Sequence, residues 1–291
     1  MAVKHSIVFL GTGPVAADSL QSLIKTFDIE AVITKAVPLH HRGIAPVEEL
    51  AKAHNLPLLF ANTKNELDDL VRKTDFLSSL GVIVDHGVIV SQEVIDSFLL
   101  GIVNSHFSLL PQWRGADPIT FSILSGQQKT GVSLMLIEPT LDTGKLITQK
   151  TLAIAKDETT PSLTDKLVTL SNELLDSYLP RYIEGKIIPH AQPHPDRATF
   201  SRKLTKQDGI LDITKPAIQL EREIRAYDGW PKSRITAFTH TVIVTKAHVS
   251  SNANDGLFFR CGDGNYLVID ELTAPSGKRM TGEAFLKGYA K

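Results

Sequence analysis

The sequence has almost no cysteine and no long apolar run, and both absences exclude classes of protein. Cys261 is the single cysteine among 291 residues, so a disulfide framework or a cysteine metal cluster cannot form, and we expect a buried structural thiol. No apolar run approaches the roughly 18 residues that a membrane span needs, and the opening "MAVKHSIVFLGTG" lacks the pattern of a signal peptide. We therefore expect a cytoplasmic protein without membrane segments.

Neither sign of charge is in large excess over the whole chain, but the balance differs between its parts. The formal net charge is −1. Residues 201–291 contain 14 Lys and Arg against 10 Asp and Glu, whereas the preceding residues contain 17 against 22. A basic C-terminal third is compatible with a polyanionic partner, although such an excess more often reflects an ordinary solvated surface.

Short apolar runs alternate with helical patterns over the first half of the chain. This rhythm is typical of a doubly wound, parallel α/β sheet. The expected strands are Ser6–Leu10, Ala31–Thr34, Leu58–Phe60, Gly81–Val84 and Gly101–Asn104. The expected helices are Pro14–Phe27, Pro46–His54 and Ser91–Phe98. "TGVSLMLIE" and "KLITQKTLAI" predict two further strands, expected to be antiparallel, before a long helix from Pro161 to Glu184.

The pattern changes after residue 185. Pro189, Pro193 and Pro195 lie close together and indicate an extended linker. A helix over Pro216–Tyr227 and period-two stretches from "RITAF" to "YLVIDEL" then predict a small β-rich domain. The expected organisation is an α/β domain over residues 1–185, a linker over 186–200 and a β domain over 201–291.

The glycines of "GTGPVA", Gly11 to Ala16, follow the first strand and open a helix, so they formally fit the dinucleotide-binding fingerprint. Such a site also needs an acidic residue near the end of the second strand, where this chain has Thr34 and Lys35. A tight strand-to-helix turn is the better interpretation, and a nicotinamide cofactor the weaker one.

The stretch "NSHFSLLPQWRGADPI" begins with polar side chains at the end of a buried strand. Asn104 and His106 flank one residue, so strand alternation points both to the same face. Parallel strands deliver their C-terminal ends to the sheet edge where ligands bind, and Asp142, in a Leu-Asp-Thr-Gly turn, could close over that spot. An Asn, a His and an Asp make a poor metal site, so no metal is expected.

These three residue types suit an acyl-transfer site. Asn104 and a protonated His106 can donate hydrogen bonds to the oxyanion of a tetrahedral intermediate, while Asp142 orients or charges the histidine and takes up a proton. Each residue also has an ordinary alternative when taken singly. Asn104 could be a turn former, His106 a core histidine and Asp142 an Asx-turn residue.

Two segments, "NSHFSLLPQWRGADPI" and "TGVSLMLIEPTLDTGKLI", resemble the signature of formyltransferases that move a formyl group from 10-formyltetrahydrofolate to an amine. The resemblance implies that Asn104, His106 and Asp142 are catalytic. "IVFLGTGPVAADSL" resembles the family's first strand and turn, which explains the glycines without a nucleotide. "SRKLTKQDGILDITKPAIQLEREIRAYDGWP" and "LTAPSGKRMTGEAFLKGY" resemble the C-terminal domain of the branch of the family that formylates methionyl-tRNA.

The resemblance implies a Rossmann-like N-terminal formyltransferase domain and a smaller C-terminal OB-like β-barrel domain that binds tRNA. The donor would be 10-formyltetrahydrofolate, and the acceptor would be the α-amino group of methionine on initiator tRNA. The enzyme would be a cytoplasmic monomer acting in translation initiation. The residues expected to bind the donor are His86, Gly87, Val88, Leu109, Leu110, Pro111, Glu138, Thr140 and Leu141. The cations expected to bind tRNA are Arg42, Arg202, Lys203, Lys206, Lys232 and Arg234.

The sequence departs from the family at two places that matter for these expectations. The loop around Arg42 is a few residues shorter than usual and lacks the family's lysines, and His86 stands where family members often have an aromatic residue. Two alternatives remain open. A formyltransferase acting on an amino sugar shares the N-terminal motifs, although the C-terminal third fits the tRNA branch better. A non-catalytic folate or RNA binder would have no need of the three polar residues.

Overall fold

The computed structural model describes residues 4–37, 45–253 and 256–289. Arg42 therefore lies outside the described residues. By its internal contacts the chain divides into two units. Unit 1 comprises Met1–Gly115, Gly131–Leu152 and Lys166–Phe200, and unit 2 comprises Ala116–Thr130, Ala153–Asp165 and Ser201–Lys291. Residues 186–200, for which the sequence indicates a linker, thus belong to unit 1.

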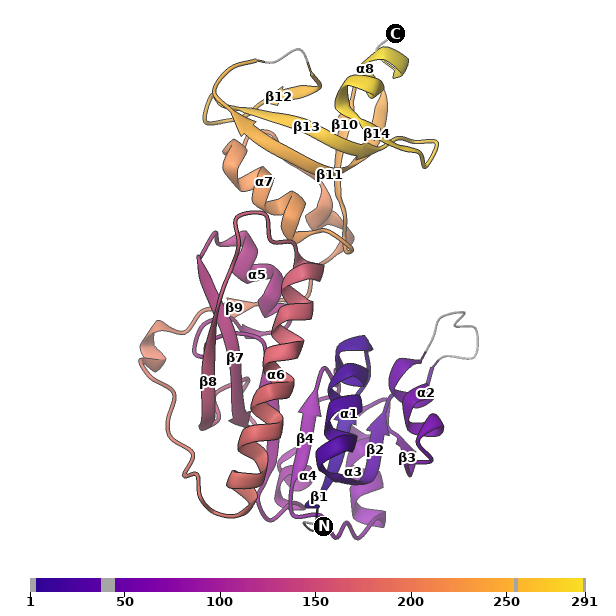
Figure 1. Ribbon diagram of the computed structural model, residues 1–291, viewed down its shortest axis with the longest axis vertical. Helices are drawn as coiled ribbons and strands as arrows, with labels where there is room; N and C mark the ends of the chain where they lie inside the picture. The colour runs from indigo at the N-terminus through magenta and orange to yellow at the C-terminus, as the bar shows by residue number, and fades with distance from the viewer. Residues whose placement is uncertain (1–3, 38–44, 254–255, 290–291) are drawn as a thin grey trace. The chain divides into compact units, whose positions relative to one another are not determined.

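Unit 1 is built around a seven-stranded sheet with the order β3-β2-β1-β4-β5-β7-β8 (Figure 1). The strands are β1 (Ser6–Gly11), β2 (Asp28–Thr34), β3 (Leu58–Phe60), β4 (Gly81–Val84), β5 (Ile102–His106), β7 (Lys129–Leu136) and β8 (Leu146–Ala153). The first five strands pair in parallel, and β7 pairs with β5 in antiparallel fashion. The predicted doubly wound rhythm and the predicted direction of β7 are confirmed.

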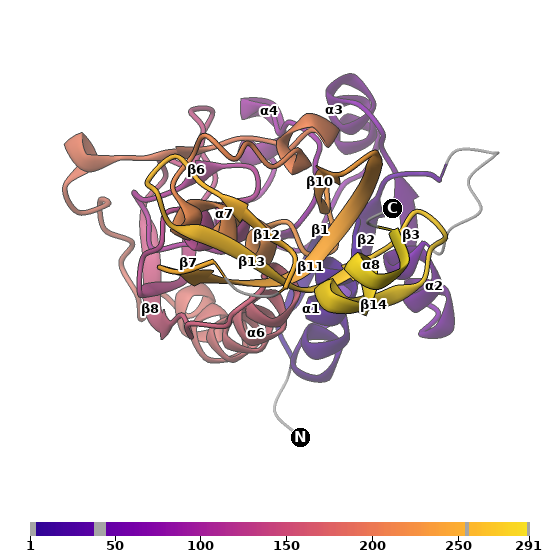
Figure 2. The same cartoon turned by 90° about the horizontal axis from the view of Figure 1, so that it is seen from above.

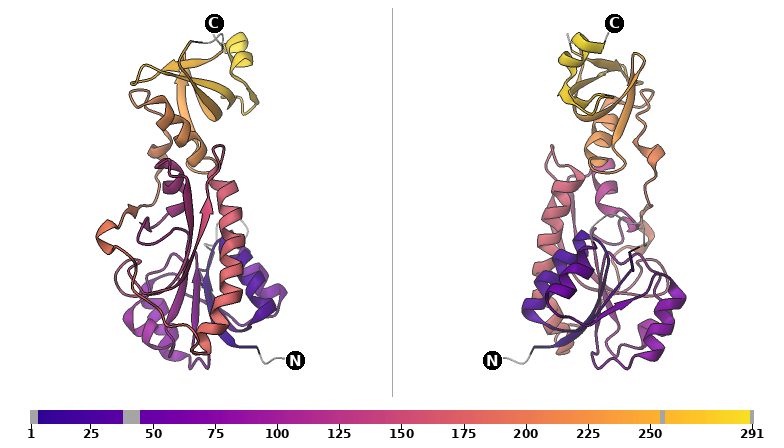
Figure 3. Two further views of the ribbon diagram at one scale, coloured as in Figure 1. Left: turned by 60° about the vertical axis from the view of Figure 1, so that its left-hand side comes forward. Right: turned by 90° about the vertical axis from the view of Figure 1, so that its right-hand side faces the viewer.

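Five helices connect or flank the strands of this sheet in the described part of the chain. They are α1 (Pro14–Thr26), α2 (Pro46–Ala53), α3 (Lys64–Lys73), α4 (Gln92–Asp96) and α6 (Thr160–Ile183). The long α6 runs alongside the strands in both views of Figure 3, and the Ser171 hydroxyl hydrogen-bonds the Ser105 hydroxyl of β5 at 2.7 Å. The central strands are apolar on both faces: in β1, Val8 and Leu10 point to one face and Ile7 and Phe9 to the other, and all four are buried. This is the composition of a sheet that is covered on both sides.

The glycine turn after β1 is explained by packing. A Cβ atom on Gly11 would lie 2.6 Å from the Cβ atom of Ala16, and one on Gly13 would lie 2.5 Å from Oδ2 of Asp85. α1 begins directly afterwards at Pro14, whose fixed φ suits the first turn of a helix. The motif is therefore a tight strand-to-helix turn, as its sequence predicts.

Unit 2 contains an antiparallel half-barrel. Its strands are β10 (Ser233–Ala237), β11 (His240–Ser250), β12 (Phe258–Arg260), β13 (Tyr266–Thr273) and β14 (Arg279–Thr281). They follow the order β10-β11-β13-β12, with β14 also paired to β13. The helices of this unit are α5 (Pro118–Leu124), α7 (Ala217–Ala226) and α8 (Gly282–Tyr289). Figure 2 shows α8 beside β14 at one end of the sheet.

The core of unit 2 is formed between α7 and the strands. Leu220 and Ile224 of α7 are buried with Leu267 of β13 and with Phe285 of α8. Cys261 is a free, buried thiol beside this core, as expected from its isolation in the sequence. Short elements complete the chain: β6 (Arg114–Gly115), β9 (Phe200–Ser201) and the 3-10 turns Pro195–Arg197 and Lys206–Gly209. Among the described residues, no helix is both long enough and apolar enough to traverse a bilayer.

Candidate active site

β5 fixes the directions of the first two predicted catalytic residues. Asn104 is paired with Ile83 of β4 and Met135 of β7, so it lies within a three-stranded stretch of ladder. Ser105, between the two predicted residues, bonds to Ser171 of α6. Because successive side chains alternate, Asn104 and His106 point to the face opposite α6. The sequence predicted this shared direction.

The Asn104 side chain is available for a ligand. It is half-buried, and its amide has no hydrogen-bond partner among the residues that the structure describes. An amide presents two N–H donors and one carbonyl acceptor. Asn104 can therefore donate to an oxygen placed over the end of β5.

The His106 ring is buried and held in one tautomer. Nε2 lies 2.9 Å from the carbonyl oxygen of Trp113. A carbonyl can only accept, so Nε2 carries the proton in the neutral ring. Trp113 presents this carbonyl from a backbone in the left-handed region, with φ of 57°. The other nitrogen, Nδ1, faces Oδ2 of Asp142 at 3.8 Å.

Asp142 reaches His106 because its loop turns back on the sheet. β7 is antiparallel to β5, so its end at Leu136 lies beside Val103, at the opposite end of β5 from His106. The chain then returns, and Asp142, with φ of 51°, accepts a hydrogen bond on Oδ2 from the Gly115 N–H at 2.7 Å.

Gly144 is required in the same loop. A Cβ atom there would lie 1.7 Å from the Leu136 carbonyl oxygen. Leu136 in turn donates its N–H to the Lys145 carbonyl at 2.9 Å. The backbone of the turn therefore packs against the end of β7 too closely for any side chain at this position.

Burial decides the charge of His106. Desolvation is the largest influence and lowers the pKa of the ring below its ordinary value, although Asp142 and the Trp113 carbonyl both act to raise it. The direction of this shift opposes the expectation that Asp142 keeps His106 charged, which stays a prediction. A lowered pKa favours the neutral ring, in which Nδ1 is the unprotonated nitrogen that faces Asp142.

The residues predicted to bind the donor lie on loops that follow β4, β5 and β7. His86 is buried, and both of its ring nitrogens lack partners among the described residues. Burial, assisted by the charge of Lys35, lowers the pKa of His86 to about 4. Gly87 has φ of 67° and open space around it, and Val88 packs against the sheet core.

The other members of this set differ in accessibility. After β5, Leu110 and Pro111 are buried and Leu109 is half-buried. In the loop after β7, Glu138, Thr140 and Leu141 are exposed. The buried members can offer a ligand only their backbone or the edge of a side chain, whereas the exposed loop can close over one. Whether these residues bind the donor stays a prediction.

Apart from Arg42, the cations predicted to bind tRNA lie in unit 2 and fall into two groups. Arg202 donates to both carboxylate oxygens of Asp208, and this pairing lowers the pKa of Asp208 well below its usual range. Arg234 is half-buried and donates to the Lys206 carbonyl. The amines of Lys203, Lys206 and Lys232 belong to exposed residues. The lysines are therefore better placed to meet phosphates than the two arginines.

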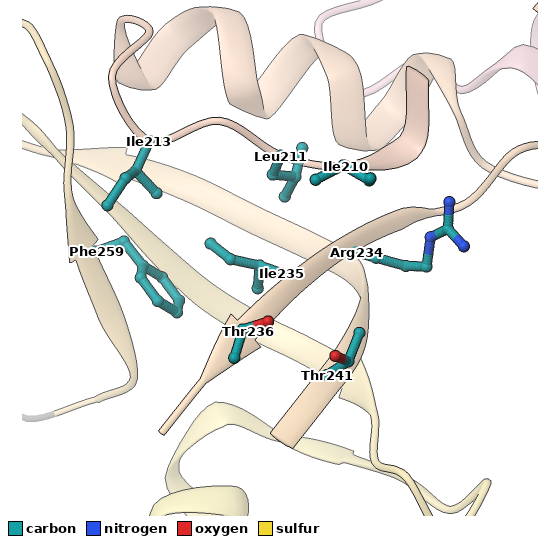
Figure 4. A pocket seen from close by; sticks show the side chains of 8 residues that line it. All are labelled: Ile210, Leu211, Ile213, Arg234, Ile235, Thr236, Thr241 and Phe259. Carbon is teal, nitrogen blue, oxygen red and sulfur yellow. The ribbon is translucent and has the colours of Figure 1, made fainter. Parts of the chain in front are cut away.

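The half-barrel also contains a hollow of about 440 Å³ (Figure 4). Its lining residues are Ile210, Leu211, Ile213, Arg234, Ile235, Thr236, Thr241 and Phe259. The lining is mostly aliphatic, and it shares Arg234 with the predicted cations but no residue with the catalytic or donor-binding sets.

Three residues that contact the site were missed by sequence reasoning. They are Trp113 and Gly115, which act through backbone groups, and Gln192, whose amide donates to the carbonyls of Asp142 at 2.8 Å and Gly144 at 3.0 Å. Backbone contacts carry no signature in the side-chain pattern, and Gln192 lies far from Asp142 in sequence. Across the described residues, no group of three or more His, Cys, Asp or Glu side chains could hold a metal ion.

Two family models match the chain. Residues 5–179 match the formyl transferase model and residues 203–290 match the model of the formyl transferase C-terminal domain. The chain belongs to the formyl transferase family.

Relatives similar over nearly the whole length are methionyl-tRNA formyltransferases. The chain is 35% identical to that of Janthinobacterium sp. (strain Marseille), with 97% of each chain covered. It is also 35% identical to that of Myxococcus xanthus, with 98% of this chain and 96% of the relative covered. A solved N-formyltransferase from Helicobacter canadensis, in complex with folinic acid and dTDP-3-aminofucose, has a TM-score of 0.69 at 16% identity and covers 92% of this chain and 99% of its own. At that identity the likeness concerns the fold alone.

Proposed function

We propose that the protein transfers a formyl group from 10-formyltetrahydrofolate to the α-amino group of methionine on initiator tRNA. The observation that carries the proposal is that Asn104 and His106 share one face of β5 and that Asp142 faces His106, in a chain similar over its full length to methionyl-tRNA formyltransferases. In this proposal residues 1–185 form the catalytic domain and residues 201–291 the tRNA-binding domain.

In the first step the neutral α-amino group attacks the formyl carbon. A C–N bond forms, and the carbonyl electron pair moves to oxygen. The Asn104 amide, which has no other partner among the described residues, donates to this oxyanion. One donor of this kind usually contributes about 100- to 1,000-fold in rate.

His106 then moves the proton. Because Nε2–H is committed to the Trp113 carbonyl, Nδ1 is the nitrogen that accepts the proton lost by the attacking nitrogen. Asp142, 3.8 Å away, stabilises the imidazolium that results. As the tetrahedral intermediate collapses, the bond from carbon to N10 of the folate breaks, and His106 returns the proton to N10. The products are formylated methionyl-tRNA and tetrahydrofolate.

The test is formyl transfer by the purified protein. Methionyl-tRNA and an amino-sugar nucleotide are offered as acceptors in separate reactions with 10-formyltetrahydrofolate. We expect formylmethionyl-tRNA in the first and no product in the second. Product only from the amino sugar would replace the proposed acceptor, and no product from either would overturn the proposed activity.

A further inference from the structure

Residues 190–199, which we call the strap, bind the loop between β7 and β8. The backbone of His190 exchanges two hydrogen bonds with Leu146, at 2.8 and 3.0 Å. Leu146 opens β8, two residues after Gly144. This end of the strap is therefore attached directly beside the turn that carries Asp142.

The other end of the strap is attached to the loop after β5. The Thr199 hydroxyl accepts a hydrogen bond from the Trp113 N–H at 2.9 Å. The Thr199 carbonyl accepts another from the Arg114 N–H, also at 2.9 Å. Trp113 is the residue whose carbonyl fixes the tautomer of His106.

Gln192 joins the two loops from the middle of the strap. It is 7% exposed, and its Nε2 donates to the carbonyls of Asp142 at 2.8 Å and Gly144 at 3.0 Å. Its Oε1 accepts from Nη2 of Arg114 at 2.7 Å. Both donor protons and the acceptor of the amide are thus in use.

Arg114 makes this connection relevant to the chemistry. Its neighbours in sequence are Trp113, whose carbonyl binds Nε2 of His106, and Gly115, whose N–H binds Oδ2 of Asp142. The backbone of Arg114 thus lies between the two groups that orient the catalytic pair, and Gln192 ties its side chain to the Asp142 loop.

We propose that Gln192 is a positioning residue for the His106–Asp142 pair. It holds the carbonyls on either side of Thr143, so that the carboxylate of Asp142 stays opposite Nδ1 of His106. The inference rests on the proposed function, because its kinetic consequence is a loss of proton transfer. A displacement of about 1 Å in such a pair can cost about 100-fold in rate.

Two variants separate the contacts of Gln192. Gln192→Met keeps the length of the side chain and removes every hydrogen bond. Gln192→Glu keeps an acceptor for Arg114 but loses both donors to the Asp142 loop. Tyr182→Phe is the matched control, because it removes one buried donor to a loop carbonyl, that of Leu100 at 2.8 Å, without contact to the site.

Both Gln192 variants should lower kcat by about tenfold or more, with KM for the donor and for methionyl-tRNA within about threefold of the wild type. The control should keep kcat within about threefold. A fall in kcat that came only from a loss of thermal stability should also appear in the control. A fall in kcat at nearly unchanged KM, seen in the Gln192 variants alone, therefore identifies positioning. If both Gln192 variants keep the kcat of the control, the proposal is overturned.

A second measurement does not depend on turnover. Hydrogen exchange over residues 138–145 should be faster in both Gln192 variants, and the pKa of His106, followed by NMR, should change, whereas Tyr182→Phe should leave both unchanged. Unchanged exchange and titration in the Gln192 variants would overturn the role of the strap. If the wild-type protein formylates neither acceptor, the proposed function fails, and exchange and titration still decide the role of Gln192.

Discussion

At the scale of single residues, the charge of His106 is set by two opposing influences. Burial favours the neutral ring, while Asp142 and the Trp113 carbonyl favour the imidazolium, and burial is the larger. The site therefore begins with a base at Nδ1 and a carboxylate ready to stabilise its protonated form. This is the order in which an attacking amine would need them.

The first prediction concerns the three polar residues of the site. Asn104→Ala, His106→Ala and Asp142→Asn should each lower kcat by about 100-fold or more, because the first removes the oxyanion donor, the second removes the base and the third removes the charge that stabilises the imidazolium. Donor binding, measured by fluorescence or calorimetry, should change little. Near wild-type turnover in all three variants would show that the chemistry lies elsewhere.

The second prediction concerns His86 and pH. Its pKa in the folded chain is about 4, below the value of about 6.5 in an unfolded chain. Between these values the unfolded chain binds more protons, so the free energy of unfolding falls as the pH is lowered.

Replacing His86 by phenylalanine removes this proton uptake. The loss of unfolding free energy between pH 7 and pH 5 should be smaller in His86→Phe than in the wild type, by about 2 kcal/mol. Urea unfolding at the two pH values measures the difference. Identical pH dependence in the two proteins would mean that His86 is not a source of acid sensitivity.

Single residues differ in how far the sequence could predict their roles. Asn104 and His106 were assigned to one face because strand alternation is a local rule, and β5 confirms it. Asp142 needed a loop that turns back along the sheet, which the Leu-Asp-Thr-Gly turn only suggested. Gln192 could not be predicted, because its partners are backbone carbonyls about fifty positions away and its own neighbourhood is rich in proline.

At the scale of secondary-structure elements, those with a strong apolar periodicity were predicted from the sequence, and those with a weak periodicity were not. The five parallel strands and α6 stood out as apolar patterns. α3 was missed because only a narrow apolar stripe, including Leu67 and Val71, faces the core. Its N-terminal signal was nevertheless present, since the Thr63 hydroxyl accepts the Glu66 N–H at 3.2 Å. β2 begins at Asp28 and not at Ala31, because polar residues at its start hid the first part of the strand.

The third prediction tests the turn between β7 and β8. Gly144→Ala should displace the turn, because its Cβ atom would lie 1.7 Å from the Leu136 carbonyl oxygen. If the turn keeps its position, the free energy of unfolding should fall by several kcal/mol. If the loop moves instead, the free energy of unfolding should fall by about 1–3 kcal/mol and kcat should fall as well.

Gly185→Ala is the control for backbone strain. Gly185 has φ of 71°, but a Cβ atom added there would meet no other atom within 4 Å, so the substitution should cost about 1–2 kcal/mol and leave kcat unchanged. Thermal unfolding and steady-state kinetics of the two variants separate strain from collision. Equal effects at both positions would contradict the close approach at Gly144.

At the scale of the whole molecule, domain organisation does not follow the order of the chain. Unit 2 includes Ala116–Thr130 and Ala153–Asp165 as well as the C-terminal residues. Within it, the Thr160 hydroxyl donates to the Ala226 carbonyl at 2.7 Å, and Arg225 donates to the Glu158 carbonyl at 2.9 Å. Deleting residues 201–291 would remove Arg225 and the Ala226 carbonyl, which hydrogen-bond Glu158 and Thr160. Point substitutions are therefore the sounder test of tRNA binding by the C-terminal domain.

The final prediction uses the exposed lysines of that domain. A triple alanine variant of Lys203, Lys206 and Lys232 should bind methionyl-tRNA more weakly, because lysines that neutralise phosphates release counterions on binding. The dependence of log K on log salt concentration should become shallower by about two units for the three positions. Arg202→Ala should change this slope less, because Asp208 already pairs with the arginine.

The control for this experiment must alter the net charge equally. A second triple alanine variant meets this need with lysines of unit 1 that pair with Glu48, Glu173 and Glu184, namely Lys52, Lys150 and Lys186. Because their charges are matched locally, this variant should keep the salt slope of the wild type. Equal slopes in all three proteins would mean that the C-terminal lysines are solvated surface, and a shallower slope only in the C-terminal variant places the phosphate contacts on unit 2.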